Sequence, residues 1–265
     1  MSDPKEDSIK RSITDLKAFA LEMGIIMSDQ ARIAAEVTET RAKQKSYSPE
    51  EIKENFDFIL QDMEKDTYKI YLQHEEKYVR DVLEAFFQRL IDYHEISNLD
   101  DAGKVISGYF KVLDNFFLSM AQSRKSRAGK TFESIHNTLF KMLEYPFDGQ
   151  IVINGKPDFL MPSARHYDTN PMECIIFTAK RTIRERWRQI VTEGTRGLGF
   201  YLATIDHRVT NEQLKEMLNN RIYLVVPSKI KEKNYSEVVN VLSFKQFFED
   251  HLDPKVKMWK RKGIL

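Results

Sequence analysis

Five short apolar runs in the second half of the chain are rich in β-branched and aromatic residues: GQIVING, PDFLMP, ECIIFTAK, GFYLATID and RIYLVVPS. Their length and composition are typical of buried strands. Helical periodicity occupies segments between and after them, at residues 182–194, 210–219 and 236–250. Strands that alternate with helices of this length predict an α/β fold with a mixed central sheet flanked by helices.

The first half of the chain predicts helices instead. Ser48 is a candidate N-cap, because Pro49 and two acidic residues follow it in SPEE. Apolar residues recur at helical spacing from Tyr68 to Tyr93. Further helices are expected in ITDLKAFALEMGIIM, at about residues 101–122 and at about residues 129–144.

Composition limits the classes of function. The 265 residues carry a formal net charge of +1, which argues against a protein that binds polyanions through bulk charge. A single cysteine, Cys174, excludes an internal disulfide and a cysteine-based zinc site. Because no signal peptide and no membrane-length apolar run is present, we expect a soluble cytoplasmic protein with no membrane partner.

Asp158 stands at the start of one predicted strand, and Lys180 stands at the end of another. Open α/β folds place their chemistry at such a sheet edge, so the two side chains are expected to meet there. A carboxylate that holds Mg²⁺ and a lysine that stabilises a phosphate suit metal-assisted hydrolysis. An aspartate after a proline is, however, more often a turn or strand-edge residue. The usual second acid, two residues before the lysine, is replaced by Thr178.

Other acids offer a substitute for the missing ligand. Glu193 follows Lys180 by 13 residues and lies on a predicted helix, and Glu133 lies on the helix that precedes the strands. We therefore expect Asp158 and Glu193 to be the metal ligands.

Arg184, Glu185 and Arg186 are consecutive, so on a helix they fan out about 100° apart. They can all reach base edges only if the helix points its N-terminal end into a groove. Arginine pairs bidentately with guanine, and glutamate accepts from the cytosine amino group, so the triplet suits a G·C-rich half-site. The alternative is a solvated helix face stabilised by pairs such as Arg181–Glu185.

Four segments occur in an order and at spacings that are typical of one enzyme family: SRKSRAGKTFE, GKPDFLMPSARHYDT, TAKRTIRERWRQIVTEG and RIYLVVPS. Together they closely resemble the catalytic domain of the EcoRII, SsoII and PspGI group of Type II restriction endonucleases, which belong to the PD-(D/E)xK class and cut CCGG-type sites. The resemblance covers roughly residues 119–250. It implies four catalytic residues: Asp158, Lys180, Glu193 and Glu133. It also implies four DNA-recognition residues: Arg184, Glu185, Arg186 and Gln122.

The resemblance also implies a division of the chain and an activity. Residues 1–118 would form a helical region for DNA contact and dimerisation, and residues 119–265 the restriction-endonuclease-like catalytic domain. A homodimer would cut double-stranded DNA at a CCNGG or CCWGG site with Mg²⁺, leaving 5′-phosphate ends with 5′ overhangs. A DNA methyltransferase would protect the same site without direct contact.

Base flipping at the central pair is a further implication, with Tyr47, Phe56, Tyr68 and Tyr93 as candidates to stack the extruded base. Two other functions remain open from the residues. A DNA-binding module without cleavage has no need of the complete catalytic set. A structure-specific repair nuclease of the same fold has no need of the Arg-Glu-Arg triplet.

Overall fold

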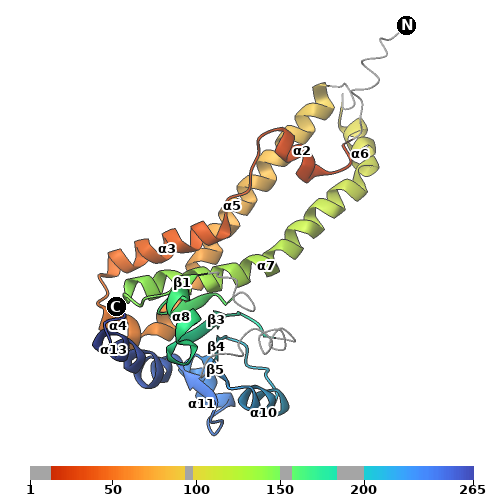
Figure 1. The fold of residues 1–265 in the computed structure, drawn as a ribbon. Coiled ribbons are helices and arrows are strands. Elements are labelled where there is room, and N and C mark those ends of the chain that lie inside the picture. Colours follow the sequence, from red (N-terminus) through yellow and green to blue (C-terminus); the bar gives the residue numbers. More distant parts are fainter. Residues whose placement is uncertain (1–12, 93–97, 150–156, 184–199) are drawn as a thin grey trace. The chain divides into compact units, whose positions relative to one another are not determined.

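The structure is a computed structural model of the chain and describes residues 13–92, 98–149, 157–183 and 200–265 (Figure 1). Two compact units divide the chain. The helical unit comprises Met1–Gln30 and Tyr68–Arg127, and the sheet unit comprises Ala31–Thr67 and Ala128–Leu265. The boundaries of these units differ from the expected division of the chain at residue 118, because residues 31–67 pack with the sheet. The functional division at that residue stays a prediction.

The boundary between the units falls inside two long helices, α5 (Phe56–Asp92) and α7 (Phe110–Met142). Within the helical unit their segments pack with α2 (Leu16–Glu22) and α6 (Leu99–Gly108) around a buried apolar cluster. The largest fully or nearly buried side chains of this cluster are Phe19, Phe86, Phe116 and Met120.

Two helix boundaries differ from the sequence prediction. The single helix expected at 101–122 is two helices, because α6 ends at Gly108 and Tyr109 forms its C-cap. Glycine has poor helix propensity, which favours an end at this position. The helix expected at 129–144 is not separate but is the last part of α7, which passes through Gly129 without a break.

The entry to the sheet unit is helical as well. Ser48 caps α4 (Pro49–Glu54) as predicted, in a capping box in which the Ser48 side chain accepts from the Glu51 amide and the Glu51 carboxylate accepts from the Ser48 amide. The preceding helix, α3 (Gln30–Lys45), was not predicted. Its buried face is made largely of alanine, valine and threonine, so it lacks the bulky apolar stripe that usually indicates a helix.

A six-stranded mixed sheet lies at the centre of the sheet unit, in the order β1 to β6. Its strands are β1 (Asp148–Gly149), β2 (Phe159–Met161), β3 (Ile175–Ala179), β4 (Phe200–Ala203), β5 (Ile222–Val226) and β6 (Val241–Ser243). The first three strands pair antiparallel, and β3 to β6 pair parallel. This arrangement confirms the predicted mixed sheet. The helix predicted at 236–250 is wrong in its first part, where β6 lies.

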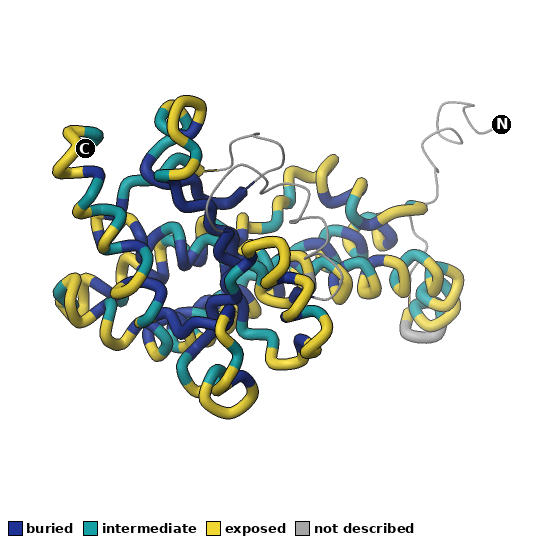
Figure 2. The backbone as a smooth tube through the Cα atoms, turned by 60° about the horizontal axis from the view of Figure 1, so that its bottom comes forward, coloured by how far each residue is buried: buried dark blue, intermediate teal, exposed yellow. Residues whose placement is uncertain are grey.

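Both faces of the sheet are buried, and Figure 2 shows buried backbone along the strands and exposed backbone on the outer turns of the helices. One face packs on α4, on the first turns of α5, on the end of α7 and on the C-terminal helices α12 (Phe244–Gln246), η2 (Phe247–Leu252) and α13 (Asp253–Arg261). The other face packs on α8 (Ala164–Thr169), α10 (Asn211–Asn219) and α11 (Ser228–Asn234). The helix predicted at 210–219 is therefore confirmed. None of the helices in the described residues is long and apolar enough to cross a membrane.

Candidate active site

Asp158 lies at the start of the antiparallel pair β2–β3. The register pairs Phe159 with Phe177, which sets Asp158 beside Thr178 on the neighbouring strand. Flanking side chains of both strands are buried in the aromatic core, so the sheet fixes the Asp158 backbone, and the residue is only 6% exposed.

Two donors from β3 fix the Asp158 carboxylate. The Thr178 hydroxyl donates to Oδ2 at 2.6 Å, and the Ala179 amide donates to the same oxygen at 2.8 Å. Thr178 therefore does not replace the second acid as a ligand. It orients the acid that is present.

Lys180 completes the cluster. Its Nζ lies 3.0 Å from Oδ1 and 2.9 Å from Oδ2 of Asp158, and its own amide donates to the Ala203 carbonyl of β4 at 2.9 Å. The Lys180 side chain is 29% exposed, whereas that of Asp158 is 6% exposed. The structure thus brings the predicted acid and lysine together, with the lysine open to solvent.

The residues that follow Lys180 are held from two elements of the sheet unit. The Arg181 guanidinium donates from Nε to Glu64 on α5 at 3.0 Å. Burial raises the pKa of Glu64, and the charge of Arg181 opposes that rise. At the end of β4, the Thr204 hydroxyl donates to the Arg181 carbonyl, and Asp206 accepts from the Ile183 amide.

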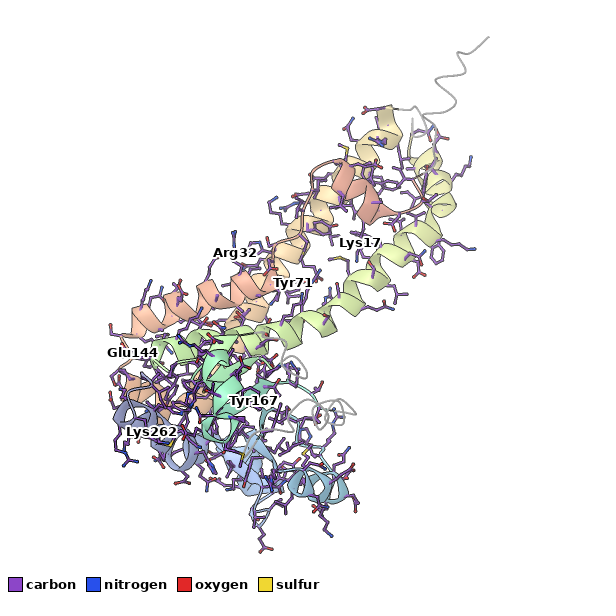
Figure 3. The ribbon with its side chains drawn as sticks, viewed as in Figure 1. Lys17, Arg32, Tyr71, Glu144, Tyr167 and Lys262 are labelled. Atoms are coloured by element: carbon purple, nitrogen blue, oxygen red, sulfur yellow. The ribbon has the colours of Figure 1, made fainter. Side chains whose placement is uncertain are left out.

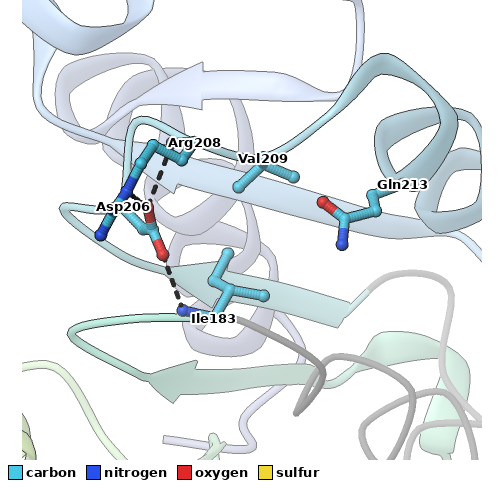
Figure 4. A pocket seen from close by; sticks show the side chains of 5 residues that line it. All are labelled: Ile183, Asp206, Arg208, Val209 and Gln213. Atoms are coloured by element: carbon cyan, nitrogen blue, oxygen red, sulfur yellow. Dashed lines mark hydrogen bonds and ion pairs between the residues drawn. The ribbon is translucent and has the colours of Figure 1, made fainter.

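A cavity of about 240 Å³ borders this region and is lined by Ile183, Asp206, Arg208, Val209 and Gln213 (Figure 4). Ile183 and Val209 form its apolar part, and the other three side chains form its polar part. It lies at the ends of β3 and β4, next to the residues that follow Lys180.

Glu133 lies on α7 in the sheet unit and is half-buried. It precedes His136 by one helical turn, and His136 is close enough to Asp158 for the carboxylate to raise its pKa. Burial outweighs this effect and lowers the pKa of His136 to about 4. Gln122 is exposed on the part of α7 that belongs to the helical unit.

Arg184, Glu185, Arg186 and Glu193 lie outside the described residues. The helix predicted at 182–194 lies outside them too, except for Thr182 and Ile183, which are not helical. Within the described ranges, no three histidine, cysteine, aspartate or glutamate side chains are grouped so that they could hold a metal ion. Asp158 is nevertheless a suitable ligand. Among the described residues its Oδ2 accepts three hydrogen bonds and its Oδ1 accepts one, so Oδ1 keeps a lone pair for a hard cation.

Comparison with known proteins identifies the family. The family described as EcoRII C terminal matches residues 74–248, which is more than half of the chain. The chain belongs to this family. The restriction-endonuclease-like fold and the resemblance inferred from the four segments are thereby confirmed.

Relatives of this EcoRII C-terminal family member include two restriction enzymes. The Type II restriction enzyme EcoRII of Escherichia coli is 33% identical over 188 residues, which span 68% of this chain and 41% of the relative. The Type II restriction enzyme SsoII of Shigella sonnei is 32% identical over 148 residues, which span 51% of this chain and 48% of the relative. The chain thus spans less than half the length of either relative.

Solved structures extend the comparison. Metal-depleted Ecl18kI in complex with uncleaved DNA superimposes with a TM-score of 0.75 at 25% identity, over 93% of this chain and 84% of that one. The complex of the restriction endonuclease PspGI with substrate DNA gives a TM-score of 0.59 at 20% identity, over 85% of this chain and 93% of that one. The second comparison supports the fold alone.

Sequence analysis did not find the residues that hold Asp158 and the segment after Lys180. The sequence offered one indication of them: Thr178, Thr204 and Asp206 are polar residues within or just after apolar strands. Their partners depend on the order of the strands in the sheet.

Proposed function

We propose that this chain is a Type II restriction endonuclease that hydrolyses double-stranded DNA at a CCNGG or CCWGG site. The observation that carries the proposal is the Asp158–Lys180 pair at the β2–β3 edge in a member of the EcoRII C-terminal family. The DNA bound in the Ecl18kI structure supports DNA as the substrate.

Metal dependence is part of the proposal. Asp158 offers a carboxylate oxygen of the kind that Mg²⁺ prefers, and the metal depletion of Ecl18kI bound to uncleaved DNA supports a metal-dependent reaction. Asp158 and Glu193 would hold the ion, with Glu133 as an additional acid. When bound, Mg²⁺ polarises the phosphate and lowers the pKa of water.

The chain's own residues prepare the site for this reaction. Thr178 and Ala179 keep the Asp158 carboxylate in one orientation, so it need not reorganise when DNA binds. Lys180 carries an ammonium group that can stabilise the negative charge that develops on the scissile phosphate. The same ammonium group forms an ion pair with Asp158 at 2.9 Å, which holds it beside the carboxylate.

Sequence recognition would come from Arg184, Glu185 and Arg186, with Gln122 as a further contact. Two copies of the chain would read the two halves of a palindrome as a homodimer. Cleavage would leave 5′-phosphate ends with 5′ overhangs, and a methyltransferase of the same restriction-modification system would protect the site in the cytoplasm.

Base flipping at the central pair requires an accessible aromatic side chain. Phe56 is 1% exposed in the core, which removes it from the candidates. Tyr68 is 53% exposed and Tyr47 is half-buried, so both remain candidates, and Tyr93 lies outside the described residues.

The direct test is digestion of a sequenced plasmid with the purified chain and Mg²⁺, followed by mapping of the cut ends. Discrete ends at CC(N)GG sequences that require the metal are expected. Binding without cuts would favour a DNA-binding module, and cuts at branched or mismatched DNA without sequence preference would favour a repair nuclease.

The Asp158→Ala substitution separates catalysis from binding. It should abolish cleavage and leave affinity for the site unchanged or stronger, because it removes negative charge beside the phosphate. Single-turnover cleavage and gel-shift titration measure the two effects. The exposed Asp168→Ala is a matched control and should cut normally. Cleavage by Asp158→Ala at the wild-type rate would remove Asp158 from the site.

A further inference from the structure

Three residues, 181–183, join Lys180 to the Arg184-Glu185-Arg186 triplet. Regular pairing of β3 with β4 ends at Ala179 and Ala203, and the Lys180 amide adds one more bond to the Ala203 carbonyl. Beyond that point, the side chains of two residues that follow β4, Thr204 and Asp206, bind the backbone of residues 181–183.

Thr204 holds the first of the three residues. Its hydroxyl donates to the Arg181 carbonyl at 3.2 Å and accepts from the Asp206 amide at 3.0 Å. Thr204 is fully buried, so this hydroxyl has no competing contact with solvent. The direction of the Arg181 carbonyl is therefore tied to the end of β4.

Asp206 holds the last of the three residues. One carboxylate oxygen accepts from the Ile183 amide at 3.3 Å, and the other accepts from the Arg208 amide at 3.1 Å (Figure 4). The Asp206 side chain is 9% exposed. Both oxygens thus accept from backbone amides, one in the segment after β3 and one in the segment after β4, in a place where water competes little.

Packing alone does not fix this segment. Arg181 and Thr182 are exposed, and the cavity of about 240 Å³ lies against Ile183 and Asp206. Only the Ile183 side chain enters the core, where it is 2% exposed. The Asp206 carboxylate therefore holds the backbone at Ile183 in addition to the packing of the Ile183 side chain and the Arg181–Glu64 ion pair.

We propose that Asp206 and Thr204 are positioning residues for sequence recognition. They set the direction in which the chain leaves Lys180 toward Arg184, and so they couple the catalytic lysine to the residues that read bases. This inference rests on the proposed function of the Arg-Glu-Arg triplet. Neither residue contacts DNA in this role.

The test compares binding to two duplexes in the presence of EDTA, one with a CCAGG site and one with its outer base pairs inverted. Four variants are measured beside wild type: Asp206→Ala, Asp206→Asn, Thr204→Val and Arg184→Ala. The exposed Glu237→Ala controls for the loss of a surface carboxylate in the same unit. Thermal unfolding of each variant reports whether it is folded.

For Asp206→Ala we expect the ratio of the two affinities to fall about tenfold, with less than about a twofold change on the inverted duplex. Asp206→Asn keeps one acceptor oxygen and should lose less discrimination. Thr204→Val keeps the shape but loses the donor to Arg181, and it should also lower the ratio. Glu237→Ala should match wild type. The single-turnover rate of cleavage of fully bound cognate DNA should change much less than the affinity ratio. A general structural defect would instead lower both.

Other outcomes are decisive as well. Equal losses on both duplexes, or an unchanged ratio, for the folded Asp206 and Thr204 variants would overturn the inference while Arg184→Ala still loses discrimination. If Asp206→Ala does not fold, Asp206→Asn and Thr204→Val decide by the same ratio. Wild-type protein that binds both duplexes equally would overturn the proposed function itself.

Discussion

Thr178 stands where many metal-dependent nucleases of this fold carry a second acid, and here it donates a hydrogen bond to Asp158 at 2.6 Å. Thr178→Val keeps the side-chain shape but removes the donor. The Asp158 carboxylate then loses one of the groups that orient it, and we expect the single-turnover cleavage rate to fall about tenfold or more. Thr178→Ser restores the hydroxyl and should cut near the wild-type rate. A Thr178→Val enzyme as fast as wild type would contradict this role.

His136 is fully buried among the rings of Phe56, Phe132, Phe140, Phe177 and Phe244. Its Nδ1 lies 2.7 Å from the Phe132 carbonyl, and its Nε2 has no hydrogen-bond partner among the described residues. Burial lowers its pKa from 6.5 to about 4, so a proton on the ring would be costly in the folded state.

This shift predicts how stability depends on pH. Between pH 6.5 and 4 the unfolded chain binds a proton at His136 that the folded chain does not, so the free energy of unfolding falls as the pH drops through this range. The loss is about 3 kcal/mol, from about 1.4 kcal/mol for each pKa unit. Urea unfolding of His136→Phe should show a flatter pH dependence. The exposed His207→Gln should behave as wild type, and an unchanged slope in His136→Phe would refute the assignment.

Sequence reasoning located Asp158 and Lys180 because Asp158 directly precedes one recognisable apolar run and Lys180 directly follows another. It could not assign partners to Thr178, Thr204 or Asp206. Those contacts depend on β3 lying between β2 and β4, and strand order is a property of tertiary packing rather than of local pattern.

At the scale of elements, long and strongly patterned segments were predicted best. β3 and β5 are continuous apolar runs, and α10 is amphipathic with a threonine cap. β6 was missed because three strand residues, Val241–Ser243, sit inside a segment whose apolar spacing also suits a helix. The break at Tyr109 was missed because the apolar pattern continues across it.

An ion cluster joins α5 and α7 within the helical unit. Glu75 is 4% exposed and accepts from the Tyr71 hydroxyl at 2.5 Å and from Arg124 Nε at 2.8 Å. Arg127 Nη1 lies 3.5 Å from Glu75 Oε2, the oxygen that also accepts from Tyr71, and its guanidinium lies 5.0 Å from the centre of the Tyr71 ring. Tyr71 is labelled in Figure 3. Burial lowers the pKa of Arg127, so its charge depends on Glu75 for compensation.

Removal of Glu75 should therefore destabilise the helical unit. Glu75→Ala leaves a partly buried guanidinium unpaired, and we expect a loss of about 3–5 kcal/mol in the free energy of unfolding. Replacing Arg124 and Arg127 by methionine in the same chain should recover much of that loss. Urea unfolding followed by circular dichroism measures both, with the exposed Glu76→Ala as the control. A Glu75→Ala protein as stable as the Glu76→Ala protein would show that the ion cluster does not contribute to the free energy of unfolding.

At the scale of the whole molecule, the proposed function predicts that two copies of the chain share one palindromic site. Native mass spectrometry with a duplex that carries one site should show two chains for each duplex. Mixing wild type with Asp158→Ala should yield dimers with one working site, which nick a single strand instead of cutting both. One chain for each duplex, or no increase in nicked plasmid on mixing, would contradict a homodimer.

The sheet unit is discontinuous along the chain, and this has a consequence for biosynthesis. Phe56 packs with Phe244 and Phe248, and Lys53 pairs with Asp253, a partner 200 positions later in the chain. At about 5–20 residues per second, a ribosome needs about 10–40 s to deliver that partner. Throughout this interval the apolar faces of α4 and of the first turns of α5 have no final cover. We therefore expect the nascent chain to depend on chaperones until α13 has left the exit tunnel.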